Sequence, residues 1–223
     1  MYKISPSDLT FSWDSCRFCF YMKVKHNIVY RGPFPSIFGR MANLTSEFYQ
    51  GKPSLELSPA LPPGVLMYRE RFVKSTPIAL PGAASQCYIS GRFDAVIEFE
   101  DGSYGVVDYK TSDAKDEHVA FYSRQLSAYA YALENPAPGA LGLAPITRLG
   151  LFVVTPDRYE RAPSGEMTFP HRTVWMDVAR DDPAFFDLLR EVLSVLDSPY
   201  PPPSSETCEL CNYRNTMRDF FAA

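Results

Sequence analysis

The stretch GRFDAVIEFEDGSYGVVDYKT, residues 91–111, contains two runs in which the side chains alternate in character. A period of two is typical of β-strands, because successive side chains point to opposite faces. Val106, Asp108 and Lys110 therefore share one face of the second strand. In the first strand one face carries Phe93, Ala95, Ile97 and Phe99, and the other carries Arg92, Asp94, Val96 and Glu98. The stretch predicts two adjacent strands with charged side chains on one face.

The turn between the strands decides whether Asp94 faces Asp108. With a two-residue turn, Asp94 would lie opposite Tyr109 and point away from Asp108. A three-residue loop over residues 100–102, with Gly102 in the left-handed conformation, places Asp94 opposite Asp108. We expect the three-residue loop, which brings both carboxylates and the ammonium group of the second strand into one space.

Two carboxylates that face each other repel unless a cation lies near them. Mg²⁺ and Mn²⁺ prefer oxygen ligands, so Asp94, Asp108, the carbonyl of Tyr109 and water would form a plausible shell. Such an ion activates water and offsets charge on a phosphate, and Lys110 could orient that water or stabilise the developing charge. The alternative is a solvated hairpin with ordinary surface charges. The combination on one apolar strand favours a site that cuts phosphodiesters.

A helix is predicted over residues 117–135, because its apolar residues recur on one stripe. Gln125 and Tyr129 are four residues apart and share a face of this helix. Together with GRFDA and GVVDYKTS, this QxxxY element resembles the RecB-like branch of the PD-(D/E)XK nuclease superfamily. The resemblance implies a metal-dependent nuclease in which Gln125 and Tyr129 lie near the DNA and the catalytic groups.

Four of the five cysteines form two CxxC pairs, Cys16 with Cys19 and Cys208 with Cys211. In a chain without a recognisable signal peptide, paired CxxC elements bind metal more often than they form disulfides. On spacing alone, four thiolates fit tetrahedral zinc or a 4Fe–4S cluster equally well. The fifth cysteine, Cys87, lies in an apolar stretch and is expected in a buried strand.

The resemblance favours the cluster. The AddB-type subunits and the CRISPR-associated RecB-like exonucleases use a 4Fe–4S cluster to join the N-terminal segment to the C-terminal tail. SPSDLTFSWDSCRFCFYMK and CELCNYR are similar to the two elements that bind it. This chain departs from the usual one-plus-three arrangement of cysteines, because it has two pairs, and zinc therefore remains the alternative.

A second departure concerns the predicted helix at about 37–50. Family members place a histidine ligand there, four residues after a glycine, but Gly39 is followed by Asn43. Glu47 lies one turn further on the same face. Either Glu47 supplies a carboxylate, or Asn43 binds weakly, or Glu47 is an exposed helix acid and the enzyme is slow or inactive. The core-facing side is expected to carry Phe38, Met41, Thr45 and Phe48.

Composition argues against a generic DNA-coating protein, which would normally be basic, since the 223 residues carry a net charge of −4. Positive potential can still be local. The residues expected to contact nucleic acid, besides Gln125 and Tyr129, are Arg124, Arg92, Lys23 and Lys25. No run of apolar residues is long enough to span a membrane. A cytoplasmic location is expected.

One domain is expected over residues 1–223, with a nuclease core at 37–198 and cysteine-bearing segments at 1–35 and 199–223 packed together. Strands are predicted near 67–74, 86–99, 104–111, 148–155 and 168–178, and a last helix from about 181 to 196. This order agrees with the α/β fold that the resemblance implies, a restriction-endonuclease-like core in which helices flank a mixed sheet.

The sequence supports two functions from different classes. The first is a DNA nuclease that depends on Mg²⁺ or Mn²⁺ and acts as an exonuclease on single strands or ends, as the relatives do. The second is a catalytically weakened DNA-binding or assembly module that keeps the fold. Protein partners in DNA processing or CRISPR adaptation fit either one. The sequence does not indicate an oligomeric state.

Overall fold

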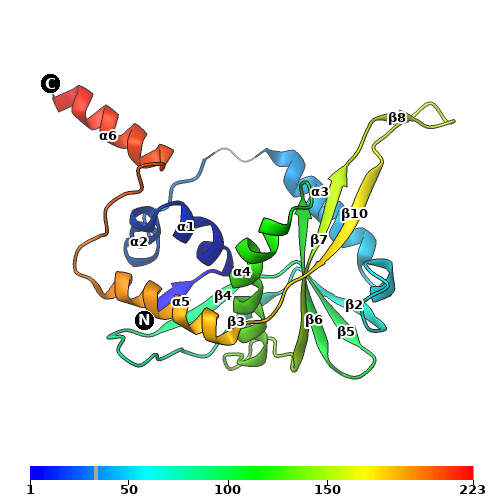
Figure 1. The fold of residues 1–223 in the computed structure, drawn as a ribbon, viewed down its shortest axis with the longest axis horizontal. Coiled ribbons are helices and arrows are strands. Elements are labelled where there is room, and N and C mark those ends of the chain that lie inside the picture. The colour runs from blue at the N-terminus through cyan, green and yellow to red at the C-terminus, as the bar shows by residue number, and fades with distance from the viewer. Residues whose placement is uncertain (33–34, 223) are drawn as a thin grey trace.

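The computed structural model describes residues 1–32 and 35–222. Its centre is a five-stranded sheet in the order β10-β7-β6-β5-β2 (Figure 1). β6 and β7 run parallel, and the other neighbours run antiparallel. The strands are β2 (Gly64–Arg69), β5 (Ala95–Phe99), β6 (Tyr104–Thr111), β7 (Ile146–Pro156) and β10 (His171–Asp177). The expected mixed α/β class is confirmed.

A smaller sheet adjoins this one in the order β1-β4-β3, formed by β1 (Tyr2–Ile4), β4 (Cys87–Arg92) and β3 (Phe72–Lys74). β2 leads into β3, and β4 leads into β5, so both strands pass from one sheet to the other. At the passage Glu70 has a φ of 50° and donates its N–H to the carbonyl of Asp94 at 2.9 Å. Asp94 therefore lies where the antiparallel ribbon bends.

This bend corrects two predictions. Residues 67–74 and 86–99 were each expected to form one strand, and each is interrupted. Apolar residues continue across both interruptions, so their periodicity carries no sign of a change of sheet. The alternation also fails at the bend, because Phe93 packs with Val96 in the larger core cluster, whereas Ala95 packs in the smaller one.

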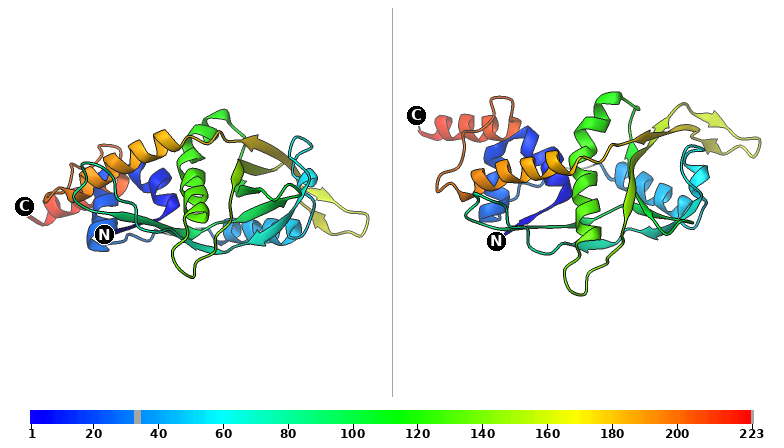
Figure 2. Two further views of the ribbon diagram at one scale, coloured as in Figure 1. Left: turned by 90° about the horizontal axis from the view of Figure 1, so that it is seen from below. Right: turned by 60° about the horizontal axis from the view of Figure 1, so that its bottom comes forward.

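Helices lie on both faces of the large sheet (Figure 2). α4 (Asp116–Glu134) and α5 (Asp182–Asp197) contribute to the larger buried cluster. α3 (Ser36–Tyr49) lies on the opposite face of the large sheet, where Tyr49 contacts Phe152 with ring centroids 4.9 Å apart. All three helices agree with the predicted ranges within one or two residues. Strands β5 and β6 lie between these layers.

The expected core-facing side of α3 was wrong. Ser46 and Tyr49 are the buried residues of this helix, while Phe38 and Phe48 are 43% and 59% exposed. The helix packs through a small residue and one aromatic ring rather than through its apolar stripe. Apolar periodicity misled here because α3 leaves several large apolar side chains in contact with solvent.

The terminal segments lie side by side (Figure 1). The N-terminal segment continues from β1 into η1 (Asp8–Ser12), α1 (Trp13–Ser15) and α2 (Arg17–His26), and it contributes Ile4, Leu9, Trp13, Phe20 and Tyr21 to the larger core. The tail ends in α6 (Glu209–Ala222), a helix that the sequence analysis did not predict. Its first turn reaches α2 through the cysteines.

Two smaller elements complete the described chain. The short helix η2 (Ser54–Glu56) lies between α3 and β2. β8 (Glu160–Arg161) and β9 (Met167–Thr168) form a hairpin that projects beyond β7 and β10 (Figure 1). Within the described residues, no helix is both long and apolar enough to cross a membrane.

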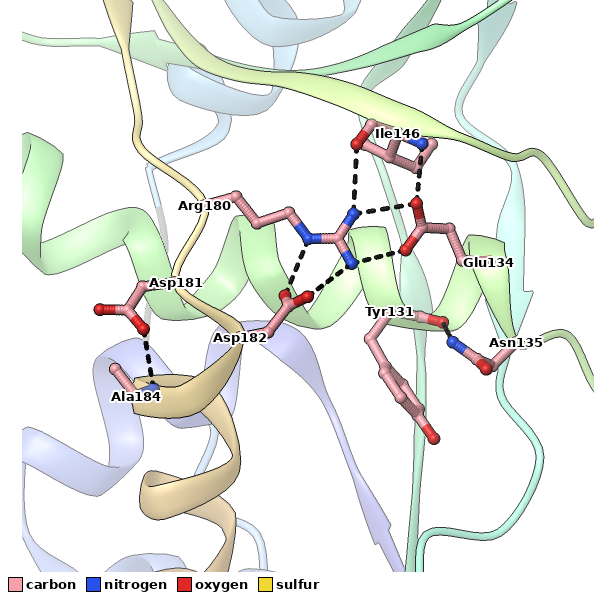
Figure 3. A network of polar contacts seen from close by, with 8 residues as sticks. All are labelled: Tyr131, Glu134, Asn135, Ile146, Arg180, Asp181, Asp182 and Ala184. Carbon is pink, nitrogen blue, oxygen red and sulfur yellow. Dashed lines mark hydrogen bonds and ion pairs between the residues drawn. The ribbon is translucent and has the colours of Figure 1, made fainter.

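A network around Arg180 joins three elements (Figure 3). Its guanidinium lies 2.6 Å from Glu134 at the end of α4 and 2.8 Å from Asp182 at the start of α5. It also donates to the carbonyl of Ile146, and Glu134 accepts the N–H of the same residue at 2.8 Å. The network fixes the C-terminal end of α4, and with it the axial position of the helix that carries Gln125.

We expect Arg180→Ala to lower the free energy of unfolding by about 1–3 kcal/mol, because Glu134 loses the cation that compensates its partial burial. Urea unfolding would measure the change. The matched control is Arg190→Ala, which removes an exposed ion pair with Asp187 on α5 and should cost no more than about 0.5 kcal/mol. Equal effects of the two substitutions would contradict a structural role for the network.

Candidate active site

The hairpin register places Asp94 opposite Asp108, as predicted. Ala95 pairs with Val107 and Glu98 pairs with Tyr104, and continuing this register by one residue opposes the two aspartates. The loop over residues 100–102 is the predicted three-residue type, with Gly102 at a φ of 82°. Glycine adopts this left-handed conformation without the steric cost of a Cβ. The turn chemistry therefore determines which carboxylates meet.

Asp108 is held from two sides. Its side chain is 4% exposed, and Oδ2 lies 2.5 Å from Nζ of Lys110. Nε2 of Gln125 on α4 donates to Oδ1 at 2.8 Å. Burial disfavours the charged form of Lys110, but the adjacent carboxylate outweighs this effect and raises the pKa of the ammonium. Lys110 is therefore a cation at neutral pH, directed at the carboxylate by period-two geometry.

Asp94 has a different environment. Its Oδ2 accepts the backbone N–H of Tyr109 at 2.8 Å. Burial first, and then the charge of Asp108, raise the pKa of Asp94 to about 7. Glu70 at the bend contributes in the same direction. The site thus concentrates negative charge that a cation would relieve.

Lys110 and Tyr129 are held by surroundings that the motifs do not reveal. Nζ of Lys110 lies 3.9 Å from the ring centroid of Tyr122, which holds the ammonium by a cation–π contact. The hydroxyl of Tyr129 donates to the carbonyl of Arg92 at 2.7 Å. A Cβ on Gly91 would lie 2.7 Å from Pro6 and 3.5 Å from Tyr129. The glycine of the GRFD motif therefore leaves room for this close packing.

The residues present fit a hard divalent cation. Oε1 of Gln125 is buried without a hydrogen-bond partner, and Oδ2 of Asp108 is buried beside the ammonium of Lys110. Asp94 lies opposite, and buried carboxylates of this kind are paired or bind metal. Asp94 and Asp108 would hold the ion, with Gln125 fixing the orientation of Asp108. The carbonyl of Tyr109 as a further ligand stays a prediction.

The structure does not bring Asn43 and Glu47 to these carboxylates in any contact between described residues. Both side chains belong to exposed residues of α3. Oε1 of Glu47, whose side chain is 55% exposed, lies 3.2 Å from Arg69, and Nε of Arg69 donates to Ser46 at 2.9 Å. Their metal-binding roles stay predictions, and the ion pair with Arg69 gives Glu47 a structural partner instead.

The sequence analysis missed Glu70 and Tyr122 as residues of this region. Glu70 follows a strand pattern, and only its positive φ and its pairing with Arg92 at 2.9 Å mark it as unusual. Tyr122 belongs to the apolar stripe of α4. The one available signal was its position three residues before Gln125, which puts it on a neighbouring part of the same helix surface.

The residues expected to contact nucleic acid already have protein partners. Lys23 lies 2.5 Å from Asp8, which is 5% exposed. Lys25 donates to the carbonyls of Leu196 and Ser198 at the end of α5.

Arg92 and Arg124 form weaker contacts. The side chain of Arg92 is 56% exposed and pairs with Glu70. Arg124 is as exposed as Lys23, but its partner Asp14 is itself 41% exposed, whereas Asp8 is buried. Exposed ion pairs are weak and exchange readily with a phosphate. The contacts of Arg92 and Arg124 are therefore easier to break than those of Lys23 and Lys25.

The four cysteines of the two CxxC pairs come together, as predicted. All four ligand atoms lie within 4.8 Å of one another. Burial opposes ionisation of Cys16, yet hydrogen bonds from the N–H of Ser205 and from neighbouring cysteines lower its pKa to about 7. Burial and the adjacent thiols raise the pKa of Cys19. The cluster is a candidate metal site, and Cys87 lies apart in β4, fully buried.

Asp94→Asn tests the electrostatics in protein stripped of metal with EDTA. The folded-state pKa of Asp94, about 7, exceeds the ordinary value of 3.8. Between these two pH values the folded protein therefore holds a proton on Asp94 that the unfolded chain has lost. This proton stabilises the folded state, and the stabilisation is lost as pH rises through 7. The unfolding free energy of the wild type should therefore fall by about 1–3 kcal/mol more than that of the variant between about pH 5 and about pH 8. Asp113→Asn, at an exposed loop position, is the control. Identical pH slopes for wild type and Asp94→Asn would refute the raised pKa of Asp94.

Comparison with known proteins agrees with this geometry. A family model described as the PD-(D/E)XK nuclease superfamily matches residues 60–216, which include all the residues of the β5–β6 and α4 site. The solved structure titled "Crystal structure of SSO0001" is similar at a TM-score of 0.52 and 18% identity, over 88% of this chain and 78% of that chain; at this identity the likeness shows the fold alone. Among curated proteins none matches. Because the family match covers well over half of the sequence, the chain belongs to the PD-(D/E)XK nuclease superfamily.

Proposed function

We propose that this protein is a divalent-metal-dependent nuclease that hydrolyses phosphodiester bonds of DNA, as an exonuclease on single strands or ends. Membership of the superfamily supports a metal-dependent nuclease. The observation that carries the proposal is the contact set of Asp108, with Lys110 at 2.5 Å on one oxygen and Gln125 at 2.8 Å on the other. A merely structural carboxylate would not need Asp94 opposite it.

Each residue has a distinct role in this reaction. When bound by Asp94 and Asp108, Mg²⁺ or Mn²⁺ supplies a Lewis acid that activates water and neutralises phosphate charge. Lys110 contributes a permanent positive charge that can orient the attacking water or stabilise charge on the phosphate. Gln125 holds Asp108 in the orientation that leaves Oδ2 directed into the site.

Tyr129 acts at the edge of the same site. Burial first, and then the two aspartates, raise the pKa of its phenol, so the hydroxyl remains a donor to the carbonyl of Arg92. Arg92 and Arg124 would contact the DNA backbone, because Arg92 is the most exposed of the predicted basic residues with an ion pair and Arg124 pairs with an exposed carboxylate. The DNA strand would then lie across the bend between β4 and β5.

The substrate, location and partners are inferred from the resemblance of the motifs to RecB-like exonucleases. This resemblance supports DNA ends or single strands as substrate, a cytoplasmic location, and partners in DNA processing or CRISPR adaptation. The same resemblance supports one nuclease domain, with core residues 37–198 joined by the cysteine-bearing segments 1–35 and 199–223.

A second candidate is a DNA-binding or assembly module that keeps the fold but turns over slowly. The observation that favours it is the position of Glu47, which pairs with Arg69 at the surface. Without a ligand from α3, the metal would rest on two carboxylates and water, and a smaller ligand set lowers affinity. The two candidates differ in turnover, whereas both predict DNA binding.

Lys110→Ala should reduce cleavage of end-labelled DNA by about 10²–10³-fold in the presence of Mn²⁺ or Mg²⁺, because a positioned charge is lost from the transition state. The matched control is Lys115→Ala, which removes an exposed lysine of the loop before α4. EDTA should abolish cleavage by the wild type. Binding of DNA by the wild type with no cleavage under either metal would reject the nuclease and favour the module.

Comparison of linear with circular single-stranded DNA of equal sequence tests the preference for ends. An exonuclease degrades the linear molecule and spares the circle, since the circle offers no terminus. Equal loss of both would retain the nuclease but exclude the exonuclease assignment. The Lys110→Ala protein is the blank for contaminating activity in both reactions.

A further inference from the structure

The sulfur atoms of the two CxxC pairs are closer together than a cluster would allow. Sγ of Cys16 lies 3.9 Å from that of Cys211, and Sγ of Cys19 lies 3.8 Å from Cys208 and 3.4 Å from Cys211. We propose that these four thiolates hold a single tetrahedral zinc ion, rather than the 4Fe–4S cluster that the family resemblance suggests. This proposal goes beyond the nuclease function and does not depend on it.

Bond lengths decide between the two groups. A Zn–S bond is about 2.3 Å, so the four sulfurs of a regular tetrahedron lie about 3.8 Å apart. The three distances above scatter around that value. In a 4Fe–4S cluster each thiolate binds a different iron at a separate corner. The cluster's own atoms then hold the ligand sulfurs well beyond the 4.8 Å within which all four lie here.

The two pairs have the same local structure. Cys16 is the N-cap of α2, and Cys208 immediately precedes α6, with the second cysteine of each pair in the first turn of its helix. Both helices therefore direct the positive ends of their dipoles at the thiolates. The N–H of Ser205 also donates to Sγ of Cys16 at 3.4 Å. Such donors stabilise the excess negative charge of four thiolates around one dication.

The volume beside the cysteines does not decide between a zinc ion and a 4Fe–4S cluster. An open groove of about 600 Å³ runs beside the cysteines and is lined by Phe11, Phe18, Met22 and Ile28 among others. It offers room for a larger group, but the sulfurs are already at the spacing of one ion. Two buried ligands, Cys16 and Cys211, and four protein ligands in all match a closed structural zinc site.

The ion would act as a staple for the tail. Cys211 is the one buried residue among the described residues of α6, while Tyr213, Phe220 and Phe221 are mostly exposed. Apart from the sulfurs, a contact of Arg214 with the ring of Phe18 at 4.6 Å joins α6 to α2. We therefore expect the metal to hold α6 against the N-terminal segment.

Metal analysis of protein purified without oxygen, from medium supplied with both iron and zinc, tests the proposal. We expect about one zinc ion per chain, with neither iron nor acid-labile sulfide in stoichiometric amount. The zinc-free protein should bind Co²⁺ with the visible spectrum of a tetrahedral thiolate site. About four iron and about four sulfide per chain would overturn the proposal. So would failure to retain zinc after reconstitution.

Variants separate this site from the nuclease site. The double substitution Cys208→Ser and Cys211→Ser should lose the zinc, whereas Asp108→Asn should keep it. Tryptic cleavage in α6, after Arg214 or Arg218, should accelerate in the double variant and in chelator-treated wild type, while the core stays resistant. Loss of zinc in Asp108→Asn instead would place the ion at the carboxylates and refute the proposal. None of these measurements requires nuclease activity.

Discussion

A buried carboxylate organises this molecule. Asp108 is 3% exposed within the central strand β6, and a charge so far from water is tolerated only with compensating partners. Lys110 from the same strand, Gln125 from α4 and the facing Asp94 constrain three elements at once. The register of β5 against β6, the axial position of α4 and the bend at Asp94 must all be correct for the site to exist.

The bend explains how one antiparallel ribbon serves two sheets. Glu70 takes a left-handed conformation that side chains with a Cβ adopt at a cost. Its N–H satisfies the carbonyl of Asp94, and its charge adds to the repulsion that raises the pKa of that aspartate. The backbone distortion at Glu70 and the repulsion between carboxylates thus both act at Asp94, the residue that faces Asp108. Such coincidence is typical of functional sites, where strain is compensated by the surrounding structure.

Much of the site could be predicted because its geometry is local. Period-two alternation fixed the shared face of Asp108 and Lys110, the left-handed glycine fixed the loop, and four-residue spacing fixed the common face of Gln125 and Tyr129. The position of Asn43 and Glu47 could not be predicted in this way. α3 buries Ser46 and Tyr49 because Arg69 and Phe152 on the sheet receive them, and no pattern within the helix reveals that partner. The same holds for Lys23 and Lys25, whose partners lie on η1 and at the end of α5.

The sequence by itself determined the α/β class, the hairpin with its two aspartates, the helix that follows it and the pairing of four cysteines. Each of these follows from periodicity or spacing within a short segment, where backbone geometry alone relates neighbouring side chains. The tertiary structure decided the break at Asp94, the orientation of α3, the partners of the basic residues and the distances between the sulfurs. These features depend on contacts between segments far apart in the chain, such as the contact between Cys19 and Cys208. Such contacts form only when folding packs one segment against another.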